Sequence, residues 1–160
     1  LSKRHITVST SGYLAGIEQL IKEGIHLNLA FSVGSADPSI RQKIMPIEHR
    51  NPITDVAQKL SQYSQLHNRK LTLEYTLLNG VNDSNQCADQ LANLALYLSA
   101  KVNLINLNPH PKIPFEPVSE KKLQGFKQRL ISKKVRTTVR YSKGQDVVAA
   151  CGQLGESNLS

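Results

Sequence analysis

The sequence has no tryptophan and only two cysteines, Cys87 and Cys151, in 160 residues. Two cysteines cannot supply a disulfide framework, so we expect a reducing, cytoplasmic setting. No apolar run approaches the roughly 18–20 residues that a membrane helix needs. The first residues are not followed by an apolar stretch of signal-peptide length. The composition therefore argues against a disulfide-rich secreted domain and against a membrane partner.

Acidic residues are also scarce, with 12 Asp and Glu against 20 Lys and Arg, which gives a net charge of +8. The excess is confined to residues 112–143, where ten basic residues face two acidic ones. Such a patch is typical of contact with a polyanion, although it also suits a solvated helix face. The residues that we expect to bind RNA are Lys133, Lys134, Arg136, Arg140 and Lys143. Few aromatic residues lie nearby, so no base-stacking platform is evident.

Strand-like and helix-like segments alternate along the chain. The predicted strands are His5–Ser9, His26–Ser32, Leu71–Leu77, Lys101–Leu107 and Val135–Tyr141. The predicted helices are Tyr13–Glu23, Pro38–Met45, a helix capped at Asn51 that runs to Leu66, one capped at Asp83 that runs to Ser99, and Ser119–Ser132. This alternation predicts an α/β fold with parallel βα repeats. Five strands do not close a barrel, so a partial (β/α) barrel and an open flavodoxin-like sheet both remain.

Polar residues lie where the first four predicted strands end. They are Ser9, Ser32, Glu74 with Tyr75, and Asn106 with Asn108. A parallel sheet brings these ends to one edge, where α/β proteins hold their sites. Polar strand ends are also common as simple entries into loops.

The two cysteines have different surroundings. Cys151 follows the last predicted strand among small residues, and the basic Arg140 and Lys143 could lower its pKa and favour the thiolate. An unreactive thiol packed under a tail is the alternative. Cys87 shares a helical stripe with leucines and is expected to be buried. No His or Cys has the spacing of metal ligands, so we expect no metal site in this chain.

Five segments, in one order along the chain, resemble a single family, the radical-SAM adenine-C2 RNA methyltransferases (the RlmN/Cfr group). The segments are VSTSG at Val8–Gly12, SVGSADPSIRQKIMPI at Ser32–Ile47, LEYTLLNGVND at Leu73–Asp83, KVNLINLNPHP at Lys101–Pro111 and AACGQL at Ala149–Leu154. The resemblance implies a radical-SAM-type partial barrel. Residues 1–160 would form a single domain, the C-terminal portion of that barrel, without its N-terminal cluster-binding half.

The resemblance also implies an activity and a set of site residues. The family uses S-adenosylmethionine and a [4Fe-4S] cluster, whose ligands would lie outside this chain, to methylate C2 of an adenine in 23S rRNA and, in some members, in tRNA. Cys151 corresponds to the cysteine that carries the methyl group as S-methylcysteine. The positions that correspond to the S-adenosylmethionine site are Ser9, Ser32, Val33, Gly34 and Asn108. The resemblance also implies a reducing electron donor and a full-length enzyme that is monomeric.

The sequence departs from the family at several positions. Val33-Gly34 stands where the family usually has Leu-His, and Gln145 replaces an acidic residue. The CxxxCxxC ligands of the cluster are missing, so we expect this chain alone to be inactive. A non-enzymatic RNA-binding remnant of the family is the alternative to part of an active methyltransferase.

Overall fold

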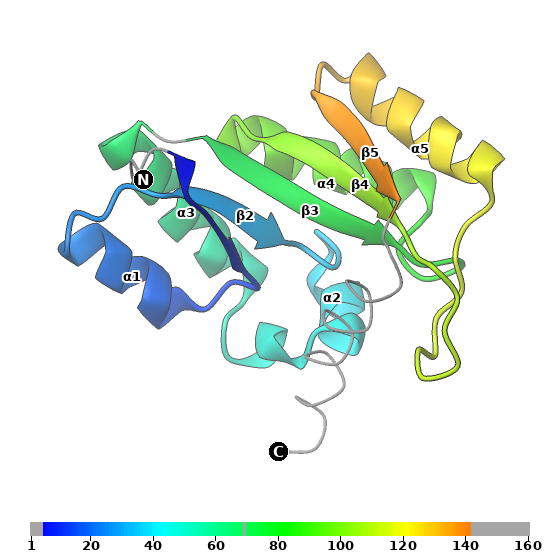
Figure 1. The fold of residues 1–160 in the computed structure, drawn as a ribbon, viewed down its shortest axis with the longest axis horizontal. Helices are drawn as coiled ribbons and strands as arrows, with labels where there is room; N and C mark the ends of the chain where they lie inside the picture. Colours follow the sequence, from blue (N-terminus) through cyan, green and yellow to red (C-terminus); the bar gives the residue numbers. More distant parts are fainter. Residues whose placement is uncertain (1–4, 69, 142–160) are drawn as a thin grey trace.

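A computed structural model describes residues 5–68 and 70–141 of the chain (Figure 1). Its strands are β1 (Thr7–Thr10), β2 (Asn28–Ser32), β3 (Leu71–Leu77), β4 (Lys101–Asn106) and β5 (Thr137–Tyr141). Its helices are α1 (Leu14–Lys22), α2 (Pro38–Ile44), the 3₁₀ helix η2 (Pro46–His49), α3 (Ile53–His67), α4 (Asn85–Leu98) and α5 (Glu120–Ser132). All the predicted segments are present, with ends shifted by a few residues.

The five strands form one parallel sheet in the order β1-β2-β3-β4-β5, so each strand lies beside its neighbour in the sequence. The predicted α/β fold with parallel βα repeats is thereby confirmed. A flavodoxin-like sheet reverses its strand order at a switch point and has helices on both faces. The sequential order here is the arrangement of consecutive units in a (β/α) barrel. The open flavodoxin-like alternative is therefore excluded for this chain.

The long helices cover one face of the sheet. Ile17 of α1, Leu60 of α3, Leu91 of α4 and Leu123 of α5 share one core with buried side chains of β2, β3 and β4. Every second residue of β3 points into this core, which its alternation of buried and half-buried positions shows. Figure 1 shows α3 and α4 behind the sheet, with α2 beyond the arrowheads of the strands.

The starts of two helices differ from their predictions. Helix α4 is capped by Ser84, whose hydroxyl accepts a 3.1 Å hydrogen bond from the Cys87 amide, and not by Asp83. Helix α3 begins at Ile53, and the Asn51 side chain accepts a bond from the Leu14 amide instead of capping α3. The Asn51 side chain therefore connects the start of α1 to the segment before α3. The local sequence does not reveal this long-range contact.

The other face of the sheet carries polar side chains. Within the described residues, 5–68 and 70–141, no helix is long and apolar enough to cross a membrane. One row of neighbours in the strand register consists of Ser32, Glu74, Asn103 and Thr138, on four adjacent strands. The sheet thus has an apolar face under helices and a polar face toward a cavity.

Candidate functional site

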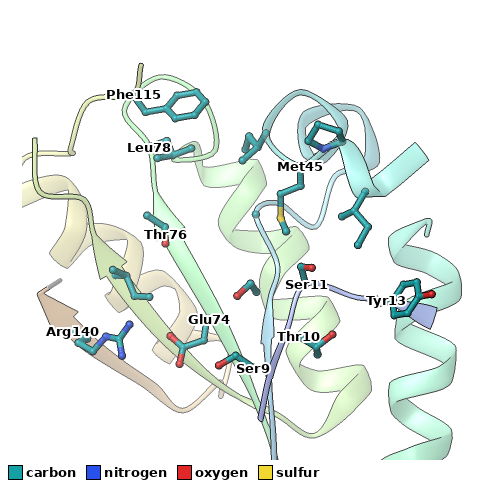
Figure 2. Close-up of a pocket in the computed structure, with 16 residues that line it drawn as sticks. Ser9, Thr10, Ser11, Tyr13, Met45, Glu74, Thr76, Leu78, Phe115 and Arg140 are labelled. Carbon is teal, nitrogen blue, oxygen red and sulfur yellow. The ribbon is translucent and has the colours of Figure 1, made fainter. Parts of the chain in front are cut away.

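A cavity of about 620 Å³ lies at the carboxyl ends of the strands (Figure 2). Its polar wall includes Ser9, Ser11, Ser32, Glu74 and Thr76, and its apolar wall includes Ile44, Met45, Leu78 and Phe115. Figure 2 shows Met45, Leu78 and Phe115 toward one end of the cavity and Ser9, Glu74 and Arg140 toward the other. Such a cavity suits a small molecule that has both a flat apolar part and a polar, charged part.

The strand register brings the predicted residues Ser9 and Ser32 into this cavity. Ser9 lies beside Ala30 of β2, two residues before Ser32, so the two serines come from adjacent strands near the same edge. Their convergence follows from the parallel pairing alone, because the carboxyl ends of parallel strands share an edge. The sequence-based expectation that polar strand ends meet is confirmed for these two residues.

The other three predicted cofactor positions lie differently. Gly34 lines the cavity and has φ +70°, and a Cβ built on it would lie 2.6 Å from the Met45 sulfur. Met45 therefore packs into the space that a side chain at position 34 would need. Val33 is fully buried in the core and is not among the residues that line the cavity. Asn108 is exposed two residues beyond the end of β4 and is not a lining residue.

A buried arginine, Arg41 of α2, holds the two loops that carry Ser11 and Val33. Its Nη2 donates to the Ser11 carbonyl at 2.7 Å, and its Nε donates to the Val33 carbonyl at 2.9 Å. Its Nη1 forms a 2.6 Å ion pair with Glu48, and its guanidinium carbon lies 5.6 Å from the centroid of the Phe31 ring. Burial lowers the pKa of Arg41, while the hydrogen bond and charge of Glu48 oppose that shift.

Two further buried groups complete this support. Glu48 of η2 also accepts a 2.9 Å bond from the Ile53 amide, which joins the arginine to the start of α3. Asn82 has no exposed surface, and its Nδ2 donates to the carbonyls of Gly34 and Thr76, each at 2.8 Å. Buried polar groups that are fully paired specify one arrangement of the backbone around them. Sequence reasoning missed all three residues, since neither spacing nor composition marks a buried arginine.

The predicted RNA-binding residues do not form one cluster. Arg140 lines the cavity, whereas Lys133, Lys134 and Arg136 precede β5 at the amino edge of the sheet. Arg140 follows Arg136 by four positions of extended chain, which places the two residues about 13 Å apart. Lys143 lies outside the described residues.

Acidic residues of α4 and the loop before it pair with part of this basic region. Lys122 pairs with Asp83 at 2.9 Å, and Arg129 and Lys133 both contact Asp89 at 2.7 and 3.5 Å. The hydrogen bonds and charge of Arg129 lower the pKa of Asp89 to about 2. Lys134 and Arg136 are exposed, and no ion pair with an acidic side chain is found for them within the described residues. The basic surface formed by residues 112–143 is thus less positive than its number of Lys and Arg residues suggests.

Neither a metal nor an iron–sulfur cluster fits the described residues. Cys87 is 3% exposed on α4, as predicted, and the described part of the chain holds no group of three His, Cys, Asp or Glu residues that could bind a metal. Clusters of this kind are held by several cysteine thiolates. Cys151 lies outside the described residues, so its role as the reactive cysteine stays a prediction from the sequence.

Known proteins resemble both the sequence and the fold. Over 154 residues the chain is 40% identical to a probable dual-specificity RNA methyltransferase RlmN 2 of Protochlamydia amoebophila, covering 96% of this chain and 43% of that protein. Over 159 residues it is 41% identical to the dual-specificity RNA methyltransferase RlmN of Nitratidesulfovibrio vulgaris, covering 99% of this chain and 43% of that protein. Nearly the whole chain is thus similar to part of the RlmN methyltransferases. It spans less than half of their length, and no family model matches it.

Solved structures agree with this relationship. A radical SAM methyltransferase from Sphaerobacter thermophilus superimposes with a TM-score of 0.85 at 40% identity, over 94% of this chain and 44% of that one. Streptococcus suis SuiB, solved with S-adenosylmethionine bound, superimposes with a TM-score of 0.60 at 10% identity and so shares the fold alone. The described sheet is therefore part of a radical-SAM-type barrel, as the sequence predicted.

The role of Arg41 as a local tether can be tested by hydrogen exchange. In Arg41→Lys the charge opposite Glu48 remains, but an ammonium cannot reproduce the planar fork that reaches Ser11 and Val33. We expect the Val33 and Ser35 amides to exchange about tenfold faster or more, since one lost buried hydrogen bond costs about 1–3 kcal/mol. Mass spectrometry or NMR of the exchanging chain gives these rates.

Tyr63→Phe is the matched control, because the Tyr63 hydroxyl accepts a 2.7 Å bond from the Leu27 amide before β2, at the opposite edge. This variant should speed exchange at Leu27 and leave Val33 and Ser35 nearly unchanged. Equal acceleration at both edges in Arg41→Lys would mean general destabilisation and would exclude a local tether.

Proposed function

We propose that this chain is part of a radical S-adenosylmethionine RNA methyltransferase that modifies C2 of an adenine in 23S rRNA, and in tRNA as a second substrate. The observation that carries the proposal is the polar cavity at the carboxyl edge, lined by Ser9 and Ser32, in a chain about 40% identical to RlmN relatives. The complete enzyme would be monomeric, cytoplasmic and supplied with electrons by a reducing partner.

The chemistry of the cavity walls supports S-adenosylmethionine as the ligand. The adenine ring of this cofactor is flat and largely apolar, which suits the wall of Met45, Leu78 and Phe115. Its ribose and amino-acid groups carry hydrogen-bond donors and acceptors, which suit Ser9 and Ser32. Gly34 also lines the cavity, and its carbonyl accepts a hydrogen bond from the Asn82 side chain.

Cys151 is proposed to accept the methyl group from S-adenosylmethionine and to pass its carbon to the adenine. A thiolate suits the first transfer because it is the nucleophilic form of cysteine. The [4Fe-4S] cluster would supply the radical chemistry that an electron-poor ring carbon needs. The described residues include no group of three His, Cys, Asp or Glu that could bind it, and we propose that its ligands lie outside this chain.

A non-enzymatic RNA-binding role is the second candidate. The observation that favours it is the Val33-Gly34 pair, since Met45 occupies the space that a side chain at position 34 would need. In that case the basic surface alone would be functional, and S-adenosylmethionine would not bind.

The two cysteines give opposite predictions for one substitution. In the complete gene product that carries this chain, Cys151→Ala should abolish RNA methylation, because no thiol remains to accept the methyl group. Cys87→Ala should leave methylation intact and cost about 1 kcal/mol or less of folding stability, since it removes one small buried atom. Methyl incorporation into RNA and mass spectrometry of the two cysteine peptides check both outcomes.

The enzymatic proposal predicts an added methyl mass on the Cys151 peptide and none on the Cys87 peptide. Full activity of Cys151→Ala would overturn the proposed chemistry. Absence of methylation in the unmodified gene product, with RNA binding retained, would favour the RNA-binding alternative.

The basic residues at the amino edge should contribute a salt-dependent part of RNA binding. Charge reversal at Lys133, Lys134 and Arg136 together should flatten the slope of log K against log salt by about 0.7 for each lost phosphate contact. Filter binding at several salt concentrations gives the slope. Reversal of Lys22, Lys43 and Lys59, on α1, α2 and α3, is the control, and an equal effect of both triple variants would show that only net charge matters.

A further inference from the structure

Glu74 places a carboxylate on the floor of the cavity, on the central strand of the sheet. It lies on the polar face of β3, half-buried, and lines the cavity together with Ser9 and Ser32. Figure 2 shows its side chain between those of Ser9 and Arg140. Sequence reasoning noted it only as a polar strand end and gave it no role.

The neighbouring strands fix the position of this carboxylate. The Asn103 Nδ2 on β4 donates to Glu74 Oε2 at 3.1 Å, and the Asn103 Oδ1 accepts from the Thr138 hydroxyl on β5 at 3.2 Å. All three residues belong to the same register row. Asn103 approaches from β4, on the side away from β2, so Glu74 Oε1 is left for a group in the cavity.

Within the described residues, no lysine or arginine forms an ion pair with Glu74. A half-buried carboxylate without an ion partner is costly unless hydrogen bonds or a ligand stabilise its charge. Asn103 supplies one such bond. The remaining acceptor capacity, about three lone-pair sites on an ionised carboxylate, is available to a ligand.

Ser32 is the neighbour of Glu74 on the other side of the same row. Adjacent strands lie about 4.8 Å apart, so the serine hydroxyl and the carboxylate can contact one small molecule at the same depth of the cavity. We propose that Glu74 is a further S-adenosylmethionine-binding residue, whose carboxylate, held by Asn103, accepts hydrogen bonds from the cofactor. This inference rests on the proposed function.

The chemistry of the cofactor matches a carboxylate. S-Adenosylmethionine carries a sulfonium and an ammonium against one carboxylate, so it is a net cation, and its ribose offers two hydroxyl donors. A carboxylate binds either kind of group, and charge-assisted bonds of this kind are stronger than neutral ones. Arg140 lines the same end of the cavity as Glu74 and supplies a positive charge for the cofactor's own carboxylate (Figure 2).

The test is the affinity of Glu74→Gln for S-adenosylmethionine, measured by equilibrium dialysis with the complete gene product that carries this chain. The glutamine oxygen can still accept the bond from Asn103, so the fold should be retained, and thermal unfolding checks this. We expect affinity to fall about tenfold or more, because hydrogen bonds to charged groups are worth about 1.5–3 kcal/mol and 1.4 kcal/mol is tenfold.

Glu18→Gln is the matched control, since Glu18 is an exposed glutamate of α1 whose partner is Lys59. It should bind S-adenosylmethionine as the unmodified protein does. S-Adenosylhomocysteine, which lacks the sulfonium charge, separates the two sources of affinity. A larger loss for S-adenosylmethionine indicates contact with the sulfonium, and equal losses indicate contact with the ammonium or the hydroxyls that both molecules share.

The outcomes separate this inference from the proposed function. If the unmodified protein binds S-adenosylmethionine and Glu74→Gln binds it within about twofold, the role of Glu74 is wrong and the proposed function stands. If the unmodified protein does not bind S-adenosylmethionine, the proposed function fails and the role of Glu74 fails with it.

Discussion

The site depends on one buried interaction, the contact of Arg41 with Glu48 and with two loop carbonyls. The loops that follow β1 and β2 have no regular secondary structure, yet residues of both line the cavity. Arg41 bonds to Ser11 in the first loop and to Val33 in the second, so a single guanidinium fixes the distance between them. A buried ion pair of this kind adds little net stability, but removing one partner is strongly destabilising. Its main consequence here is therefore one defined geometry for the cavity wall.

The rest of the site follows from the two faces of the sheet. Helices on one face bury the apolar side chains of every second strand residue, which leaves the polar residues of the same strands to the other face. The parallel pairing then aligns Ser32, Glu74 and Asn103 in one row. Arg140 belongs to this cavity by position, whereas Lys133, Lys134 and Arg136 lie at the amino edge of β5. The cofactor contact and the RNA contact that we propose thus lie at opposite edges of one sheet.

The sequence predicted the strands, the helices, the buried Cys87 and the meeting of Ser9 with Ser32, because hydrophobic period and strand direction decide these features locally. It did not predict the roles of Arg41, Asn82 or Asn51, whose partners lie as many as 48 residues away in the chain. It also grouped Arg140 with Lys133 and Lys134, since charge counted along a chain does not show that β5 separates them. The predicted helix cap at Asp83 is wrong, because Asp83 pairs with Lys122 and Ser84 caps the helix.

The central claim is that the cavity at the carboxyl edge of the sheet binds S-adenosylmethionine. A crystal structure of the complete gene product with this cofactor tests the claim most directly. We expect the adenine ring against Met45 and Phe115 and the polar groups of the cofactor within hydrogen-bond distance of Ser9 and Ser32. Cofactor bound elsewhere on the protein, with no contact to either serine, would contradict the account.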